Sequence, residues 1–363
     1  MTSDCSNIQF PSGYNGPEAV SVANGSMIPI QNYGQGILPL PDSSLILIYM
    51  DDILITGNNS SSINNLLATL RSQFALKQLG QINLFLGIQV SRTESDFFLH
   101  QQHYAEKLLQ EAGFINSKPC PTPITPTSRH QPSESTPFSD PTLYHRLAGS
   151  LQYLTITRPD IAYATNQACQ HMQNPTTTNF NQLKRILRYI NGTKSFGLPI
   201  APGDTTLQTF TDADWASDLS DRKSISGTCT FLGPNLISWS VKKQLTVAKS
   251  STEAEYRALS ASVSEILWLR RLASELQLHQ SSPTLIHCDN LSAIAIAKNP
   301  VFHARTKHIE IDYQFIRQHL AAGNILIQHI ASHDQAEDIL TKPFSSSCFD
   351  FLRHKLTVQP HNA

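Results

Sequence analysis

Carboxylates at four separate points of this 363-residue chain are the residues best suited to chemistry: Asp212, Glu255, Asp289 and Asp338. Each lies at the edge of an expected helix or strand, so folding could bring them together. Asp212 follows the strand-forming residues Thr209–Thr211, and in a strand Asp212 and Asp214 share one face. Converging carboxylates repel one another unless a cation lies between them. Oxygen ligands suit Mg²⁺, and two such ions about 4 Å apart support phosphodiester chemistry.

Structural explanations compete with this one. The run Ser250–Glu253 is a capping box, and Thr252 and Glu255 have the same spacing. Only one of the two glutamates is needed to cap, and residues two apart on a helix face nearly opposite ways. Asp289, with Asn290, could cap the next helix, and Asp338 could lie in a first helical turn, where the helix dipole favours an acid.

Composition bounds the class of protein. The chain has 27 Lys and Arg against 28 Asp and Glu, which argues against a wholly basic nucleic-acid binder but leaves room for a local basic groove. The six cysteines show neither a disulfide framework nor a zinc pattern. We expect an intracellular protein, in the cytoplasm or nucleus, because the start lacks a signal peptide and the apolar runs are too short for a membrane.

The elements from Leu207 onward should position the four acids. The pattern predicts three strands, a long helix over about 251–276, a strand ending at Asp289, two helices, a strand over 325–330 and a final helix bearing Asp338. This order predicts a mixed α/β region with a five-stranded sheet and helices on its faces.

The N-terminal half has its own acidic pair. Residues 1–43 read as an unstructured leader, and then two apolar runs flank Asp51 and Asp52, which indicates a hairpin. The pair is either an ordinary solvated turn or a site for Mg²⁺. A helix over 60–74 and a second hairpin around 93–96 follow.

A linker rich in Pro, Ser and Thr covers 117–141, and three helices follow it, with a break at Arg158-Pro159. The third helix carries Lys184, Arg185 and Arg188. Lys184 and Arg188 share a face, with Arg185 adjacent, and these residues either form a solvated basic face or contact phosphates of a duplex.

The motifs resemble those of copia-type retrotransposon Pol polyproteins. The stretch Tyr49, Met50, Asp51 and Asp52 is similar to the metal-binding motif of their reverse transcriptases, and FLGI, TRPDIAYA, DADWA, EAEY, CDN, TKHI and AEDILTK follow in the family's order. The resemblance covers about residues 44–345. It implies the C-terminal part of a reverse-transcriptase palm over 44–116, the linker over 117–141, a helical thumb or connection over 142–205, a ribonuclease H-like domain over 206–345 and a tail over 346–363.

The resemblance also implies site residues. Asp212, Glu255, Asp289 and Asp338 match the ribonuclease H acids, so two Mg²⁺ ions and an RNA–DNA hybrid or nucleic-acid duplex are expected as cofactor and partner. His333 matches a loop histidine that helps product leave in many ribonucleases H. Further basic residues could touch nucleic acid or could simply be solvated: Lys242, Lys243, Lys249, Lys307 and His308.

Polymerase activity is expected to be lost. Fewer than 50 residues precede Tyr49, and none resembles the family's fingers or its third polymerase carboxylate. We therefore expect a fragment that cleaves the RNA strand of hybrids with Mg²⁺. The alternative is a catalytically silent remnant that at most binds nucleic acid. The oligomeric state is not predicted.

Overall fold

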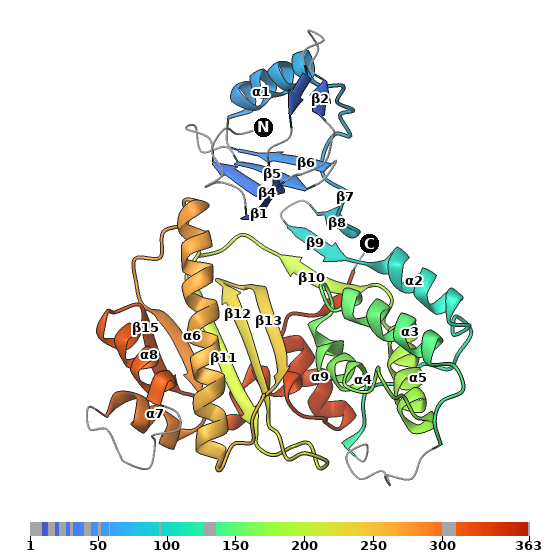
Figure 1. Ribbon diagram of the computed structural model, residues 1–363, viewed down its shortest axis with the longest axis vertical. Helices are drawn as coiled ribbons and strands as arrows, with labels where there is room; N and C mark the ends of the chain where they lie inside the picture. Colours follow the sequence, from blue (N-terminus) through green and yellow to red (C-terminus); the bar gives the residue numbers. More distant parts are fainter. Residues whose placement is uncertain are drawn as a thin grey trace. The chain divides into compact units, whose positions relative to one another are not determined.

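The structure is a computed structural model, and it describes residues 9–13, 19–21, 27–29, 32–39, 45–49, 52–57, 59–93, 96–126, 136–299 and 310–361. Met50, Asp51, Lys307 and His308 therefore lie outside the described residues. The chain divides into two compact units, one of residues 1–85 with 271–279, and one of residues 86–270 with 280–363. Figure 1 shows both units in sequence colours.

The first unit contains an antiparallel sheet with the strand order β1-β4-β5-β6 and a separate β2-β3 pair. Its hairpin pairs Tyr49 of β5 with Asp52 of β6, as predicted. The strands β1 to β4 fall within the expected leader, which differs from that expectation. The elements are β1 (Gln9–Gly13), β2 (Ala19–Ser21), β3 (Met27–Pro29), β4 (Asn32–Pro39), β5 (Leu45–Tyr49), β6 (Asp52–Thr56), α1 (Ser60–Gln73) and β7 (Leu84–Phe85).

The second unit begins with a hairpin and the predicted helices. Strands β9 and β10 pair antiparallel, and β8 pairs with β9. The helices α3, α4 and α5 match the three expected ones, with a short 3₁₀ turn, η3, at the Arg158-Pro159 break. These elements are β8 (Ile88–Arg92), β9 (Phe97–His100), α2 (Gln102–Glu111), α3 (Pro141–Leu154), η3 (Pro159–Ile161), α4 (Ala162–Cys169), α5 (Thr177–Gly192) and β10 (Phe196–Ile200).

The predicted five-stranded sheet follows, with the order β13-β12-β11-β14-β15. Strands β13, β12 and β11 are antiparallel, whereas β14 and β15 are parallel to β11, so the sheet is mixed. Helix α6 crosses one face of this sheet (Figure 1). The elements are β11 (Leu207–Asp214), β12 (Ile225–Leu232), β13 (Asn235–Lys243), α6 (Ser251–Glu275), β14 (Thr284–Cys288), α7 (Leu291–Lys298), α8 (Glu310–Ala321) and β15 (Ile325–His329).

Two short turns, η5 (Ser332–Asp334) and η6 (Ala336–Leu340), end the expected ribonuclease H-like domain. The region expected as a tail, 346–363, contains α9 (Ser346–Lys355) and β16 (Gln359–Pro360), so it is folded. Asp338 thus lies on a 3₁₀ turn rather than an α-helix. Phe349, Leu352 and Leu356 are buried, because every third or fourth residue of α9 turns toward the core. Strand β16 pairs with β10.

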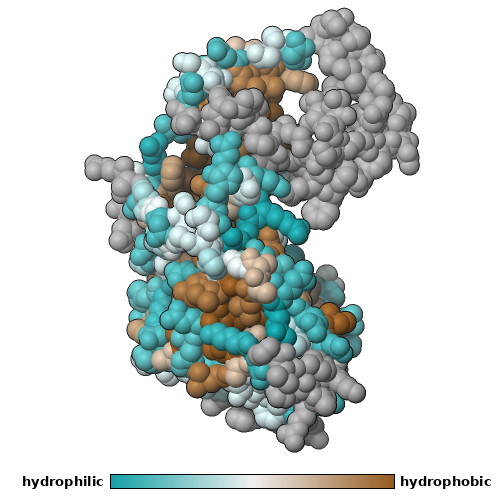
Figure 2. Space-filling model, turned by 90° about the vertical axis from the view of Figure 1, so that its left-hand side faces the viewer, coloured by the Kyte–Doolittle hydropathy of each residue, from teal (hydrophilic) through white to brown (hydrophobic). Residues whose placement is uncertain are grey.

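One apolar core joins the helical region to the sheet. It gathers buried residues of α2, α3, α5, β12, η6 and α9, so the expected connection and ribonuclease H-like regions share their packing. A second core lies under α6, α7 and α8. Leu326 of β15 and Trp268 of α6 are exposed. Figure 2 shows apolar residues on the side of the molecule that is at the left in Figure 1.

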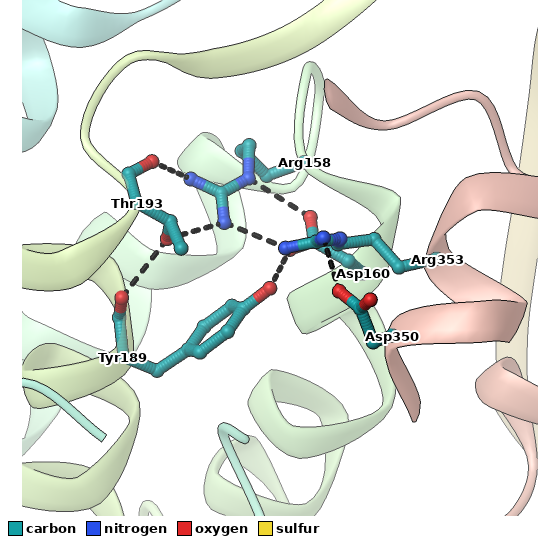
Figure 3. Close-up of polar contacts among 6 residues, drawn as sticks. All are labelled: Arg158, Asp160, Tyr189, Thr193, Asp350 and Arg353. Atoms are coloured by element: carbon teal, nitrogen blue, oxygen red, sulfur yellow. Dashed lines mark hydrogen bonds and ion pairs between the residues drawn. The ribbon is translucent and has the colours of Figure 1, made fainter. Parts of the chain in front are cut away.

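A buried network of hydrogen bonds connects residues of the helical region (Figure 3). Arg158 donates to both carboxylate oxygens of Asp160 at 2.9 and 2.7 Å, and to the backbone oxygen of Thr193 at 2.7 Å. Tyr189 donates to Asp160 at 2.7 Å. Burial opposes ionisation of Asp160, but the Arg158 guanidinium and these hydrogen bonds hold the pKa of the carboxyl below its ordinary value.

Candidate metal centre

Asp212 lies on β11, the central strand of the five-stranded sheet. Its side chain is buried, and its backbone is opposite Gly227 of β12. Strand β14 pairs in parallel with the other side of β11. Asp289, the residue after β14, therefore lies at the same end of these two strands as Asp212. The parallel pairing therefore brings together two acids that are far apart in the sequence.

Helix α6 supplies the third acid. Ser250 and Glu253 cap the start of α6: Glu253 N donates to Ser250 Oγ at 3.2 Å, and the Glu253 side chain turns back to accept from Lys249 N at 2.9 Å. Because Glu253 caps the helix, Glu255 is not needed there, and its side chain faces Asp212. Asp212, Glu255 and Asp289 each offer an oxygen within 4.8 Å of the others.

The environment of Glu255 favours its protonated form in the absence of a cation. Burial, the charge of Asp212 and a hydrogen bond with Asp212 raise the pKa of Glu255 to about 10. Its Oε2 is buried and has no hydrogen-bond partner. A divalent cation would supply the missing partner and reverse this preference, so the three oxygens fit Mg²⁺.

Asp338 of η6 joins Asp212 in a second acidic group, together with Glu337. Lys342 bridges this group: its Nζ donates to Asp338 Oδ1 at 2.8 Å and forms an ion pair with Asp212 Oδ2 at 3.0 Å. Burial raises the pKa of Asp338 to about 6, opposed by Lys342 and reinforced by the charge of Asp212. Asp212 is therefore shared by both groups.

Several residues at the centre were missed by sequence reasoning. Glu337 is fully buried and neither of its carboxylate oxygens has a partner, so its pKa lies well above the ordinary value. Thr341 donates to Asp212 Oδ2 at 2.8 Å, and Ser332 donates to Asp289 Oδ2 at 2.8 Å. The only sequence signal for Glu337, Thr341 and Lys342 was their proximity to Asp338 in one motif.

His333 follows Ser332 on η5. Its side chain is 78% exposed, and its Nε2 lies 3.0 Å from Asp334. Through Ser332, this loop is tied to Asp289, so His333 lies at the rim of the centre rather than among the acids. Its role in product release stays a prediction.

The basic residues of α5 are largely engaged within the fold. Arg185 donates to Thr122 Oγ1 at 2.8 Å, and Arg188 donates to the backbone oxygen of Lys118 at 2.7 Å. Lys184 lies over the ring of Phe180 and donates to Asn181. The two arginines thus bind the segment after Ser117 to α5, and the structure does not place them in a groove.

The lysines of β13 differ from each other. Lys243 pairs with Asp218 and Asp221, whereas Lys242 is exposed. Burial opposes ionisation of Asp218, but Lys243 and the hydrogen bonds from Ser220 lower the pKa of this carboxyl to about 2. Lys249, at the start of α6, is also exposed, so Lys242 and Lys249 remain available to solvent.

The polymerase motif is described only in part. Tyr49 is half-buried on β5 and Asp52 is exposed on β6. Within the described ranges, Asp52 belongs to neither of the two acidic groups suited to a metal ion.

Comparisons with known proteins identify the family. The chain is 42% identical to the retrovirus-related Pol polyprotein from transposon RE1 of Arabidopsis thaliana, over 93% of this chain and 23% of the polyprotein. It is 34% identical to that from transposon TNT 1-94 of Nicotiana tabacum, over 85% of this chain and 24% of the polyprotein. The chain belongs to the copia-type Pol polyprotein family. It spans about a quarter of the length of these relatives.

Other relatives of this Pol-family chain agree. Residues 36–126 match the family described as "Reverse transcriptase (RNA-dependent DNA polymerase)". An uncharacterized mitochondrial protein of Arabidopsis thaliana, AtMg00810, is 46% identical over 61% of this chain and 93% of its own length. The match to the reverse-transcriptase family agrees with the family resemblance.

Solved structures with similar regions include a ribonuclease H and a viral reverse transcriptase. LC11-RNase H1 in complex with an RNA/DNA hybrid has a TM-score of 0.30 at 14% identity, covering 38% of this chain and 94% of that chain. The foamy viral protease-reverse transcriptase in complex with double-stranded DNA has a TM-score of 0.46 at 13% identity, covering 78% of this chain and 46% of that chain.

No helix in the described ranges is long and apolar enough to cross a membrane.

Proposed function

We propose that the second unit is a Mg²⁺-dependent nuclease that cuts the RNA strand of an RNA–DNA hybrid. One observation carries the proposal: Asp212, Glu255 and Asp289, from three elements, offer oxygens within 4.8 Å of one another, and an oxygen of Glu255 is buried without a partner. Acids that face one another in a largely buried site are costly, and Glu255 and Asp289 form no ion pair with Lys or Arg in the described ranges, so a cation would relieve this cost.

The residues would act as follows. Asp212, Glu255 and Asp289 would hold one ion, and Asp212 with Asp338 would hold the other, because Asp212 belongs to both groups. Bound Mg²⁺ would promote ionisation of water and stabilise the charge that develops on the departing 3′ oxygen. Ser332 and Thr341 would orient Asp289 and Asp212 through the hydrogen bonds described above.

The substrate would be recognised by shape and by the exposed lysines. The 2′-hydroxyls of the RNA strand and the form of the hybrid distinguish it from double-stranded DNA. Lys242 and Lys249 are exposed in the same unit and could contact phosphates. We expect polymerase activity to be lost, and primer extension by this chain checks that expectation.

The test is Mg²⁺-dependent cleavage of a hybrid labelled on its RNA strand. Asp212→Asn and Glu255→Gln should each lower the rate by more than the roughly 10- to 100-fold that loss of a group supporting a metal ligand costs. Asp214→Asn is the matched control on the same strand and should keep most of the activity. Equal cleavage by all variants would refute the site.

The silent-remnant alternative rests on a specific contact. The Lys342 ammonium pairs with Asp212 and Asp338, so one half of the acid centre already has a counter-ion from the chain itself. Hybrid binding by the wild type, with no cleavage at any Mg²⁺ concentration, would establish this alternative.

A further inference from the structure

Lys342 has an unusual place beside the acids. Its Nζ lies 2.8 Å from Asp338 Oδ1 and 3.0 Å from Asp212 Oδ2, and its side chain is only 31% exposed. The 3₁₀ turn that precedes it is firmly held, because Ile339 and Leu340 are buried in the core. The ammonium group is therefore presented to the centre by a rigid element.

The ammonium and a divalent ion would compete for the same oxygens. Asp212 Oδ2 contacts the Lys342 ammonium and also accepts a hydrogen bond from Thr341 Oγ1, which engages the lone pairs of this oxygen. Asp338 Oδ1 accepts from Lys342 as well. A Mg²⁺ ion on both oxygens would need contacts of about 2.1 Å along directions that the ammonium occupies, and the two cations would repel.

The other group of acids meets this counter-ion only at the shared Asp212. Within the described part of the chain, neither Lys nor Arg forms an ion pair with Glu255 or Asp289, and the charges of Asp212 and Asp289 both act on Glu255. Glu255 Oε2 is buried and has no partner. A first ion bound here would meet the Lys342 charge only through Asp212, whereas an ion on Asp212 and Asp338 would meet it at both ligands.

We propose that Lys342 makes the two halves of the centre unequal. The first divalent ion binds to Asp212, Glu255 and Asp289, and a second ion binds to Asp212 and Asp338 only when the Lys342 side chain leaves them. Lys342 is thus a positioning residue that sets the order and the affinity of ion binding. This inference rests on the proposed metal centre, and it adds that occupancy of the second position is limited by the chain's own cation.

Ion counting tests the inference without an activity readout. The probe is Mn²⁺, titrated into the full chain while the electron paramagnetic resonance signal of free Mn²⁺ is measured. The wild type should bind one ion, with a second at least about tenfold weaker. Lys342→Met should bind the second ion at least about tenfold more tightly than the wild type, because the competing charge is gone. Lys342→Arg should behave like the wild type.

Lys355→Met is the matched control for loss of one partly buried lysine. Lys355 Nζ donates to the backbone oxygen of His333 and pairs with Asp334, neither of which belongs to the two acid groups, so this variant should match the wild type. Two equal ions in the wild type, or no change in Lys342→Met, would overturn the inference. No ion bound to either protein would refute the metal centre itself, which separates the two failures.

A second measurement uses the wild type alone, in case Lys342→Met does not fold. Acetic anhydride labelling of lysines is followed by mass spectrometry at increasing Mn²⁺ concentrations. Lys342 should be labelled slowly until Mn²⁺ reaches the range of the weaker ion, and several-fold faster above it, whereas Lys355 should not change. Labelling of Lys342 that stays constant throughout would contradict the proposal.

Discussion

The carboxylate of Glu337 lies directly against Gly227 of β12. A Cβ atom at position 227 would overlap Oε1 of Glu337 and lie 3.0 Å from the methyl group of Thr341. Gly227 is also the backbone partner of Asp212 in the sheet. The absence of a side chain at 227 therefore makes room for a buried acid beneath the metal centre.

This relationship predicts a coupled pair of substitutions. Gly227→Ala should lower the free energy of unfolding by about 1–3 kcal/mol, because the new methyl group overpacks the site. In a Glu337→Ala background the same change should cost less than half as much, since the overlapping carboxylate is gone. Urea unfolding of the four proteins in the cycle measures the coupling. Additive effects would contradict the close approach.

The buried acids predict how stability depends on pH without divalent ions. Burial and neighbouring carboxylates raise the pKa of Glu255 to about 10 and that of Asp338 to about 6. Raised pKa values mean that the folded state binds extra protons once the pH exceeds the unfolded values, about 4.5 and 3.8. Above those values these two groups should therefore make stability fall as the pH rises, up to about pH 6 for Asp338 and about pH 10 for Glu255, by about 1.4 kcal/mol per pH unit for each extra proton.

Urea unfolding in a chelator between about pH 5 and about pH 9 measures this slope. Glu255→Gln should flatten it by roughly one proton, because the amide does not titrate. Mg²⁺ should restore stability most at high pH, where the ligands ionise at least cost. A wild-type slope equal to that of Glu255→Gln would show that Glu255 is not held protonated.

Sequence patterns located the acids but not their surroundings. The strand run before Asp212, the capping box at Glu253 and the strand before Asp289 are local signals, and they predicted the sheet and the start of α6, whereas the choice of Glu255 and Asp289 as site acids came from the family resemblance. Glu337, by contrast, depends on Gly227, and Lys342 depends on Asp212, each far away in the sequence. Such pairs are set by tertiary packing, which periodicity does not report.

The same limit explains the basic residues and the chain end. Arg188 looked available for phosphate because its partner, the backbone oxygen of Lys118, belongs to a segment without helical or strand pattern. The spacing of Phe349, Leu352 and Leu356 fits an amphipathic helix, but the core that receives them comes from other parts of the chain.

The buried pair in Figure 3 predicts a large loss of stability. Arg158→Met should lower the free energy of unfolding by about 3–5 kcal/mol, because it leaves the Asp160 carboxylate buried without its partner. Lys107→Met is the control, since the Lys107–Glu111 pair is 3.9 Å long and well exposed. It should cost less than about 1 kcal/mol in urea unfolding. Similar losses for both variants would argue against the network.

Arg188 distinguishes linker anchoring from phosphate binding. If its bond to the Lys118 carbonyl is its main role, Arg188→Met should speed amide hydrogen exchange at Cys120 and Thr122 and leave the salt dependence of hybrid binding unchanged. Lys184→Met, on the same helix, should change neither. A shallower salt dependence of binding with unchanged exchange would instead assign Arg188 to phosphate contact.

Helix α9 offers two phenylalanines with opposite surroundings. Phe349 is 4% exposed and meets Tyr189 edge-on, with the ring centroids 5.6 Å apart, whereas Phe351 is 53% exposed. Phe349→Ala should cost about 3–5 kcal/mol because it empties a packed site in the main core. Phe351→Ala should cost less than about 1 kcal/mol, mostly from its contact with Lys355. Thermal and urea unfolding compare the two, and equal, small losses would mean that residues after 345 do behave as a tail.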